Sequence, residues 1–94
     1  MEFEWDSSKN KRNVLKHGIA FEETVPLFED LKILRLPDLK HSTTTERREI
    51  LIGPSAKGIL LVIFTIRNLT TIRIISARKA HRKERLFYEK NSKV

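Results

Sequence analysis

Ile59-Leu60-Leu61-Val62-Ile63-Phe64 is the longest uninterrupted apolar run of the chain, and it decides the fold. A short run that is apolar on both faces predicts a central strand covered on both sides. Within a few residues the sequence becomes strongly cationic: Arg73-Ile74-Ile75-Ser76-Ala77-Arg78-Lys79-Ala80-His81-Arg82-Lys83-Glu84-Arg85. A buried sheet that ends beside a charged element can hold several cations in fixed positions, so phosphate binding is the first function to consider.

Strand and turn signals alternate on both sides of this run and predict an antiparallel meander. The predicted strands cover residues 31–36, 47–53, 59–67 and 70–76. Residues 53–58 and 67–70 have the composition of hairpin turns. Residues 37–45 form a polar excursion that contains His41.

The N-terminal third predicts a short strand and two helices. Phe3 and Trp5 alternate with glutamates, which favours a strand with its aromatic face turned inward. Side-chain oxygens at residues 6–8 can cap a helix that ends at His17, and Gly18 suits the left-handed position after it. A second helix follows around residues 21–28, and Pro26 should make it irregular because proline removes a backbone donor.

From about Ala77 the pattern becomes helical, with Ala77, Ala80, Glu84 and Phe87 on one stripe. Together these elements predict one α+β domain over residues 1–94, in which an antiparallel sheet is packed by two N-terminal helices and one C-terminal helix. A chain of 94 residues has room for one core only.

The charge balance favours a polyanionic partner. Nineteen Lys and Arg residues against twelve Asp and Glu residues give a net charge of +7, which attracts phosphate backbones. Charge alone leaves RNA, DNA and an acidic protein open. The absence of cysteine excludes disulfides and thiolate metal sites. The N-terminus lacks the features of a signal peptide, and the longest apolar run is too short to cross a bilayer, so a cytoplasmic location without membrane contact is expected.

Motifs at both ends of the chain resemble the BrnT family, the toxin half of a bacterial type II toxin–antitoxin pair. The residues that carry this resemblance are Trp5-Asp6, Lys9, Asn13, Lys16-His17-Gly18 and Phe21-Glu22-Glu23 near the N-terminus, Asp38, His41, Glu46-Arg47 and Ile52-Gly53 in the middle, and Arg73-Ile74-Ile75-Ser76-Ala77-Arg78, Ala80, Glu84-Arg85 and Tyr88 near the C-terminus. Three positions depart from the family pattern: Pro26, Ile66, where many relatives carry an acidic residue, and His81, where a small hydroxyl residue is common.

The resemblance implies a RelE-like fold and a ribonuclease that arrests translation. It also implies a BrnA-type antitoxin as partner. That antitoxin carries the DNA-binding segment of the complex, so DNA would be contacted only indirectly. No cofactor and no metal are implied. Cleavage would proceed by attack of a ribose 2′-OH on the adjacent phosphodiester, which yields a cyclic phosphate and a 5′-hydroxyl.

Such a reaction needs cations that stabilise the charge on the phosphate oxygens, and a base and an acid that move protons. Arg73 and Arg78 are the first candidates for holding the scissile phosphate, although Arg78 could instead pair with Glu84 or Glu46. His41 with Glu46 is the candidate for proton transfer, because imidazole exchanges protons near neutral pH. Against this, a loop histidine can simply be exposed.

Tyr88 is the remaining catalytic candidate, as a ring that binds or orients a base, or else as half-buried packing. Four further residues are candidates for substrate binding: Arg47, Lys57, Ser76 and Arg82. Ser76 could equally be the N-cap of the last helix, and Lys57 a solvated hairpin lysine. The rival to an enzyme is a non-catalytic basic module that binds nucleic acid or an acidic protein, and a third reading is a degenerate toxin that only binds its antitoxin.

Overall fold

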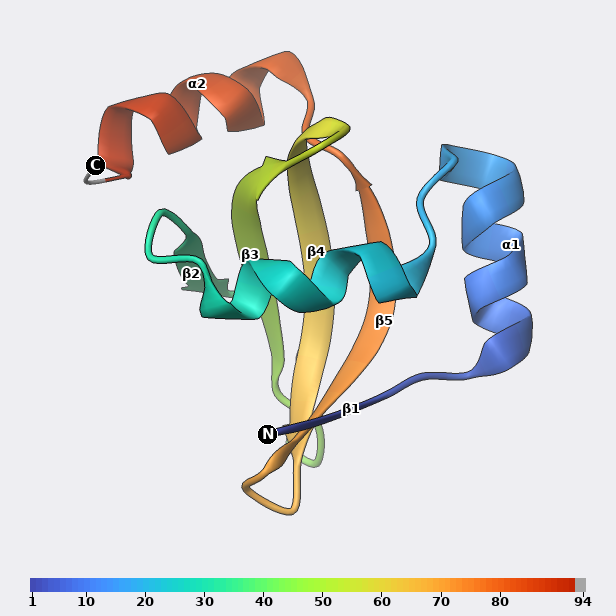
Figure 1. The fold of residues 1–94 in the computed structure, drawn as a ribbon. Helices are drawn as coiled ribbons and strands as arrows, with labels where there is room; N and C mark the ends of the chain where they lie inside the picture. The colour runs from blue at the N-terminus through green and yellow to red at the C-terminus, as the bar shows by residue number, and fades with distance from the viewer. Residues whose placement is uncertain (93–94) are drawn as a thin grey trace.

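The computed structural model describes residues 1–92 and shows a five-stranded sheet with three helices, which confirms the α+β class (Figure 1). The elements in chain order are β1 (Glu2–Glu4), α1 (Ser7–His17), η1 (Phe21–Glu29), β2 (Leu34–Pro37), β3 (Arg48–Ser55), β4 (Gly58–Arg67), β5 (Thr71–Lys79) and α2 (Arg82–Asn91). Among these residues no helix is long and apolar enough to cross a membrane.

The sheet has the order β1-β5-β4-β3-β2, and the predicted meander from β2 to β5 is confirmed. The first strand, for which the sequence indicated no partner, lies parallel to β5, with Phe3 opposite Ile72. The sheet is therefore mixed. β4 lies at its centre, as the apolar run predicts, and Leu60, Val62 and Phe64 on one side of it are at most 1% exposed.

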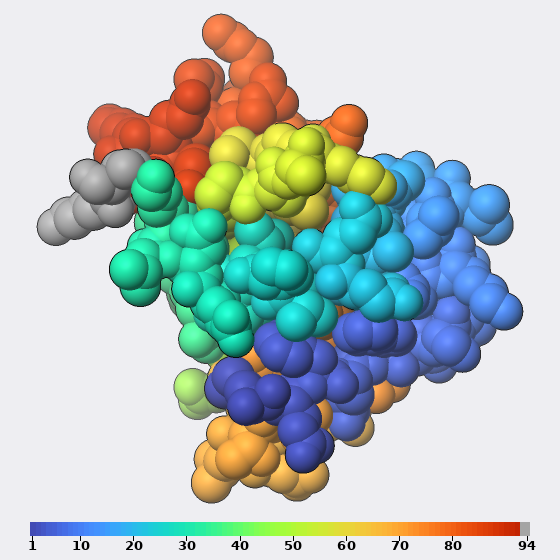
Figure 2. All heavy atoms as spheres, viewed as in Figure 1, coloured from blue at the N-terminus to red at the C-terminus, as the bar shows by residue number. Residues whose placement is uncertain are grey.

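The two sides of the sheet are covered differently. η1 lies across one side and closes the main core over Phe21, Leu27 and Phe64. Figure 2 shows that, seen from this side, η1 and the N-terminal segment hide most of the sheet. The opposite side carries a smaller apolar cluster under α2, built on Ile52, Leu61 and Tyr88. We call this second side the open face.

η1 is a 3-10 helix, which confirms the irregular geometry predicted from Pro26. Its buried residues are Phe21, Thr24 and Leu27, three residues apart, as the three-residue turn of a 3-10 helix requires. An α-helix would instead bury the residues four and seven positions after Phe21, but Val25 and Phe28 at those positions are only partly buried.

α1 is fixed to the edge of β5 by one buried amide. Asp6 caps its N-terminus and Gly18 ends it at φ 72°, both as predicted. Asn13, which is 7% exposed, donates its side-chain amide to the carbonyl of Ala77 and accepts from the backbone N–H of the same residue. Asn13 therefore continues the hydrogen bonding of β5 beyond the end of β1.

The end of β5 is where the sequence prediction was wrong. Ala77 and Arg78 do not begin a helix; they pair with Val62 and Leu61 on β4. Ser76 is consequently a strand residue opposite Ile63 and not an N-cap. α2 begins after His81, whose backbone N–H donates to the carboxylate of Glu84 at 2.7 Å. The hydrogen bonds from Asn13 and β4 extend the strand beyond the point where the local pattern favours a helix.

Candidate functional site

A row of polar side chains crosses the open face at the level where four strands meet. Arg48 on β3 lies opposite Thr65 on β4, Thr65 lies opposite Arg73 on β5, and Arg73 lies opposite Glu4 on β1. Since directly opposed residues of a sheet point to the same side, all of these side chains belong to one face. Neighbouring strands are about 4.8 Å apart, so Arg48 and Arg73 stand about 10 Å apart across Thr65. Long side chains that start about 10 Å apart on one face can both reach a phosphate placed between them.

Arg73 is held by an ion pair across β1. Its Nη1 donates to Oε2 of Glu4 at 2.8 Å, and the side chains are 29% and 40% exposed. The pair orients the guanidinium while leaving it open to solvent. Arg73 lies within β5, between β1 and β4, and two strands away from Arg48.

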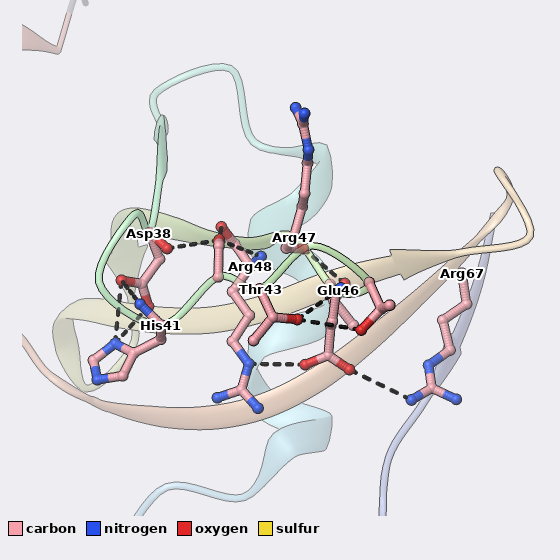
Figure 3. Close-up of polar contacts among 10 residues, drawn as sticks. Asp38, His41, Thr43, Glu46, Arg47, Arg48 and Arg67 are labelled. Atoms are coloured by element: carbon pink, nitrogen blue, oxygen red, sulfur yellow. Dashed lines mark hydrogen bonds and ion pairs between the residues drawn. The ribbon is translucent and has the colours of Figure 1, made fainter.

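Glu46 holds two arginines together (Figure 3). Its Oε1 accepts from Nε of Arg48 at 2.9 Å, and its Oε2 lies 3.7 Å from Nη2 of Arg67. The hydrogen bond from Arg48, with the charges of Arg48, Arg67 and Lys9, lowers the pKa of Glu46 below its ordinary value. Glu46 is thus kept as a carboxylate that orients arginines, which makes it a poor proton donor near neutral pH.

His41 lies at the margin of this cluster, and its carboxylate partner is Asp38, whereas the sequence had suggested Glu46. Nδ1 of His41 lies 2.9 Å from Oδ2 of Asp38, whose side chain is only 6% exposed. The imidazole itself is 57% exposed, and Nε2 makes no hydrogen bond to residues 1–92. A buried carboxylate that binds one ring nitrogen fixes the ring and leaves the other nitrogen for proton transfer.

The loop that carries His41 is tied to Arg48 through the backbone. The N–H of Asp38 donates to the carbonyl of Arg48 at 2.9 Å, and the N–H of Arg48 donates to Oγ of Ser42 at 2.9 Å. In Figure 3 the side chains of His41, Glu46, Arg48 and Arg67 point to the same side of the strands. The loop therefore places an imidazole beside the arginine row.

Arg78 occupies the other end of the open face, where α2 begins. It binds the carboxylate of Glu84 through both terminal nitrogens, at 2.8 and 2.9 Å. This bidentate contact raises the pKa of Arg78 and lowers that of Glu84. The pairing with Glu84 that the sequence left open is therefore present, and both side chains remain 27% exposed. Ser76 lies on β5 between Arg73 and Arg78, partly buried.

Three sequence candidates lie away from this face or are engaged elsewhere. Arg47 points to the opposite side from Arg48 (Figure 3). Lys57 does not reach out from its hairpin; its Nζ contacts Oε1 of Glu23 at 2.8 Å and the carbonyl of Gly18 at 2.9 Å. Tyr88 is 7% exposed and donates its hydroxyl to the carbonyl of Lys32. The buried ring of Tyr88 holds α2 on the sheet and offers no surface for stacking on a base.

Arg82 lies exposed in the first turn of α2, near Arg78 in sequence but without an acidic partner among residues 1–92.

The structure adds residues that the sequence analysis missed: Asp38, Arg48 and Arg67. Strand alternation could have identified Arg48, because Leu51 faces the main core and residues an odd number of positions away must face the other side. The same alternation places Arg67, three residues after Phe64, on this face, but nothing in the sequence indicates its contact with Glu46.

Metal ligation is not apparent in the described part of the chain. Within residues 1–92, no group of three or more His, Asp or Glu side chains comes together closely enough to hold a metal ion. The functional groups of the open face are instead arginines and one imidazole. Carboxylates hold Arg48, Arg67, Arg73 and Arg78. These groups can bind and polarise a phosphodiester and move a proton beside it.

Comparisons with known proteins agree with this arrangement. The model of a family described as the ribonuclease toxin, BrnT, of a type II toxin-antitoxin system matches residues 5–84. Among solved structures, the chain is similar to the crystal structure of the Brucella abortus ribonuclease toxin, BrnT, with 27% sequence identity and a TM-score of 0.69. The similarity covers 87% of this chain and 99% of that chain. The comparison with curated proteins finds no match.

Proposed function

The chain belongs to the BrnT family of ribonuclease toxins of type II toxin–antitoxin systems, and from that premise we propose that it is a metal-independent endoribonuclease that cleaves RNA on the open face. The observation that carries this proposal is the row of Arg48, Thr65 and Arg73 across three adjacent strands. Two guanidinium groups on one rigid surface match a phosphodiester better than a single cation does, because each can bind a phosphate oxygen in a fixed direction.

The proposed reaction starts with removal of the 2′-OH proton by His41. The 2′ oxygen then attacks the adjacent phosphorus, the bond from phosphorus to the 5′ oxygen breaks, and the departing oxygen takes a proton from water or from the protonated imidazole. The products are a 2′,3′-cyclic phosphate and a 5′-hydroxyl. Arg48 and Arg73 stabilise the negative charge that builds on the phosphate oxygens.

The other groups support these residues. Asp38 acts as a positioning residue for His41, because its buried carboxylate fixes one ring nitrogen. Glu46 positions Arg48 and Arg67. Arg78, Ser76 and Arg82 are proposed to contact the RNA at the end of the face near α2. The sequence-based role of Tyr88 in base binding is replaced by a structural one, since its ring is buried.

The biological setting follows from the family. We propose that the protein acts in the bacterial cytoplasm, that cleavage arrests translation, and that a BrnA-type antitoxin neutralises it and mediates any contact with DNA. The rival reading, a basic module that binds without cleaving, makes a different prediction for the same surface. It requires the cations but has no use for an imidazole fixed by Asp38.

The experiment is incubation of antitoxin-free protein with a defined RNA in EDTA, followed by identification of the product ends. We expect cyclic-phosphate ends, and their loss in Arg73→Ala and His41→Ala. Arg35→Ala is the matched control, because Arg35 forms a similar ion pair with Glu49 at 2.7 Å but stands over the ring of Phe64, which lies in the main core on the covered side. RNA that stays intact but is bound by the wild type and released by Arg73→Ala would favour the binding module.

A further inference from the structure

A second cationic surface lies beside the open face and is not used by the proposed chemistry. α1 and β5 enclose a shallow hollow of about 330 Å³, lined by Lys9, Arg12, Lys16 and His17 from α1 and by Ser76 from β5. Lys9, Arg12 and Lys16 follow each other at helical spacing, so they project from one side of α1. From Lys9 to Lys16 the helix rises about 10 Å.

These three cations differ from the arginines of the open face in having no acidic partner. Within residues 1–92, Lys9, Arg12 and Lys16 form no ion pair and donate no side-chain hydrogen bond, and all three are exposed. Arg48, Arg73 and Arg78 are each bound to a glutamate. Unpaired positive charge next to the site therefore lies on α1, in addition to Arg82 at the start of α2.

The cations of α1 lie along one side of the open face, from the end near Glu46 to the end near Arg78. At the N-terminal end of α1, Lys9 is close enough to affect Glu46. The hydrogen bond from Arg48 is the main cause of the lowered pKa of Glu46, and the charges of Arg48, Arg67 and Lys9 add to it. At the other end, burial lowers the pKa of His17, and the charges of Lys16 and Arg78 add to the effect. The helix thus runs alongside the face that carries Arg48 and Arg78.

The position of α1 is fixed, which allows its side chains to form a defined surface. Asn13 stands between Lys9 and Lys16 on the same side of the helix and is bound to both backbone groups of Ala77 and to the carbonyl of Ile19. Ser76 precedes Ala77 on β5. The hollow is therefore a rigid junction between the sheet and the helix.

We propose that α1 forms a second wall of the RNA site, on which Lys9, Arg12 and Lys16 bind the backbone phosphates of nucleotides that flank the scissile bond. This inference rests on the proposed function and names the path of the substrate beyond the reacting phosphate. A single-stranded polyanion suits the hollow because flexible cations spaced along two helical turns can follow a chain of phosphates. An acidic protein would need apolar anchors beside the charges, and the exposed apolar side chains of α1, Val14 and Leu15, line a different hollow with Lys11.

The test measures how the affinity for RNA depends on salt. The probe is a short single-stranded RNA with 2′-O-methyl riboses, which lacks the attacking hydroxyl and cannot be cleaved by the proposed reaction. The α1 variant is Lys9→Ala/Arg12→Ala/Lys16→Ala. The control variant is Lys11→Ala/Lys32→Ala/Lys90→Ala, which removes the same charge from exposed positions outside this hollow. Lys11 lies on α1 as well, but it lines the other hollow of that helix. Thermal unfolding establishes that both variants fold.

Each phosphate contact with a single strand contributes about 0.7 to the slope of log affinity against log salt. We expect the slope of the α1 variant to be smaller than that of the wild type by about 2, so that the affinity ratio between them falls about 20-fold from 50 to 200 mM salt. The control variant should keep a slope close to that of the wild type.

Three results would overturn the inference, and they can be told apart. Equal changes of slope in both variants would show that total charge, and not the position of Lys9, Arg12 and Lys16, sets the affinity. An unchanged RNA slope together with lost binding of a polyglutamate probe by the α1 variant would assign the helix to an acidic protein. Absence of salt-dependent RNA binding by the wild type would contradict the proposed function itself.

Discussion

Arg47 and Arg48 offer a sharp test of the open face, because neighbouring residues of one type point to opposite sides of the sheet (Figure 3). Arg48→Ala and Arg47→Ala remove the same charge, so any change in electrostatic steering is matched between them. We expect kcat/KM for cleavage of a defined RNA to fall by about 10²- to 10³-fold in Arg48→Ala, the loss found when one donor to a developing oxyanion is removed. Arg47→Ala should stay within about 2-fold of the wild type.

The stability change should be too small to explain such a loss. Arg48 forms an ion pair with Glu46 at 2.9 Å, and the two side chains are 31% and 33% exposed. A pair with this exposure contributes about 0 to 1 kcal/mol. Glu46 also lies 3.7 Å from Arg67, a cationic partner that the substitution does not remove. Since 1 kcal/mol shifts the Tm of a domain of this size by about 4 to 8 °C, we expect Arg48→Ala to melt no more than about 8 °C below the wild type.

The assay is single-turnover cleavage with antitoxin-free protein, read beside thermal unfolding of each variant. Equal losses of activity in Arg47→Ala and Arg48→Ala would refute the assignment of the site to one face, because they would show dependence on charge alone. A loss in Arg47→Ala only would place the RNA on the side covered by η1.

Three further predictions concern stability. Tyr88→Phe should lower the free energy of unfolding by about 1 kcal/mol in chemical denaturation, because the carbonyl of Lys32 loses its donor, and should leave RNA cleavage unchanged. Glu84→Gln should destabilise the protein by about 0.5 to 1 kcal/mol at neutral pH. The pKa of Glu84 is lowered from 4.5, so the stability that its carboxylate contributes is present above that pH and disappears as the pH falls through the lowered pKa. Denaturation curves of the variant and the wild type should therefore converge in acid. Leu69→Gly should stabilise the protein by about 0.5 to 1 kcal/mol, because Leu69 is 91% exposed and sits at φ 65° in the β4–β5 turn, where glycine carries no steric cost; an unchanged or lower Tm would contradict this.

The parts of the fold that the sequence predicted are those decided by local chemistry. The apolar run gives β4 directly, Asp6 and Gly18 set the ends of α1, and Pro26 gives η1 its irregular geometry. The end of β5 was mispredicted because its cause is not local. Ala77 is bound by Asn13, which lies 64 residues away in the sequence, and a register shift between Ile63 and Phe64 adjusts the pairing before it.

The candidate site, like the fold, has some features that follow from local sequence and others that depend on distant residues. Its cationic composition and the pairing of Arg78 with Glu84 were accessible from a short stretch of sequence. The partner of His41 was not, because the burial of Asp38 depends on the loop folding back on the backbone of Arg48. The interpretation of Tyr88 failed for a related reason, since the carbonyl that accepts its hydroxyl comes from Lys32, which lies 56 residues away in the sequence.

The arginines of the proposed site are paired with glutamates, and this pairing affects how strongly they attract RNA from solution. Arg48, Arg73 and Arg78 are oriented before RNA arrives, each by a glutamate that cancels its charge at a distance. These pairs are partly exposed, so replacing the carboxylate by a phosphate costs only about 0 to 1 kcal/mol for each pair. Such paired cations position a phosphate well but attract it weakly from solution.

The unpaired cations of α1 supply what the paired arginines lack. Lys9, Arg12 and Lys16 carry their charge without a carboxylate among residues 1–92, beside a face that spans Arg48 to Arg78. Attraction of RNA and alignment of its reacting phosphate are therefore assigned to different side chains. Substitutions on α1 should change the salt dependence of binding with little effect on single-turnover cleavage at saturating RNA, whereas Arg73→Ala should slow cleavage at saturation. Reversal of these two effects would show that alignment and not attraction depends on α1.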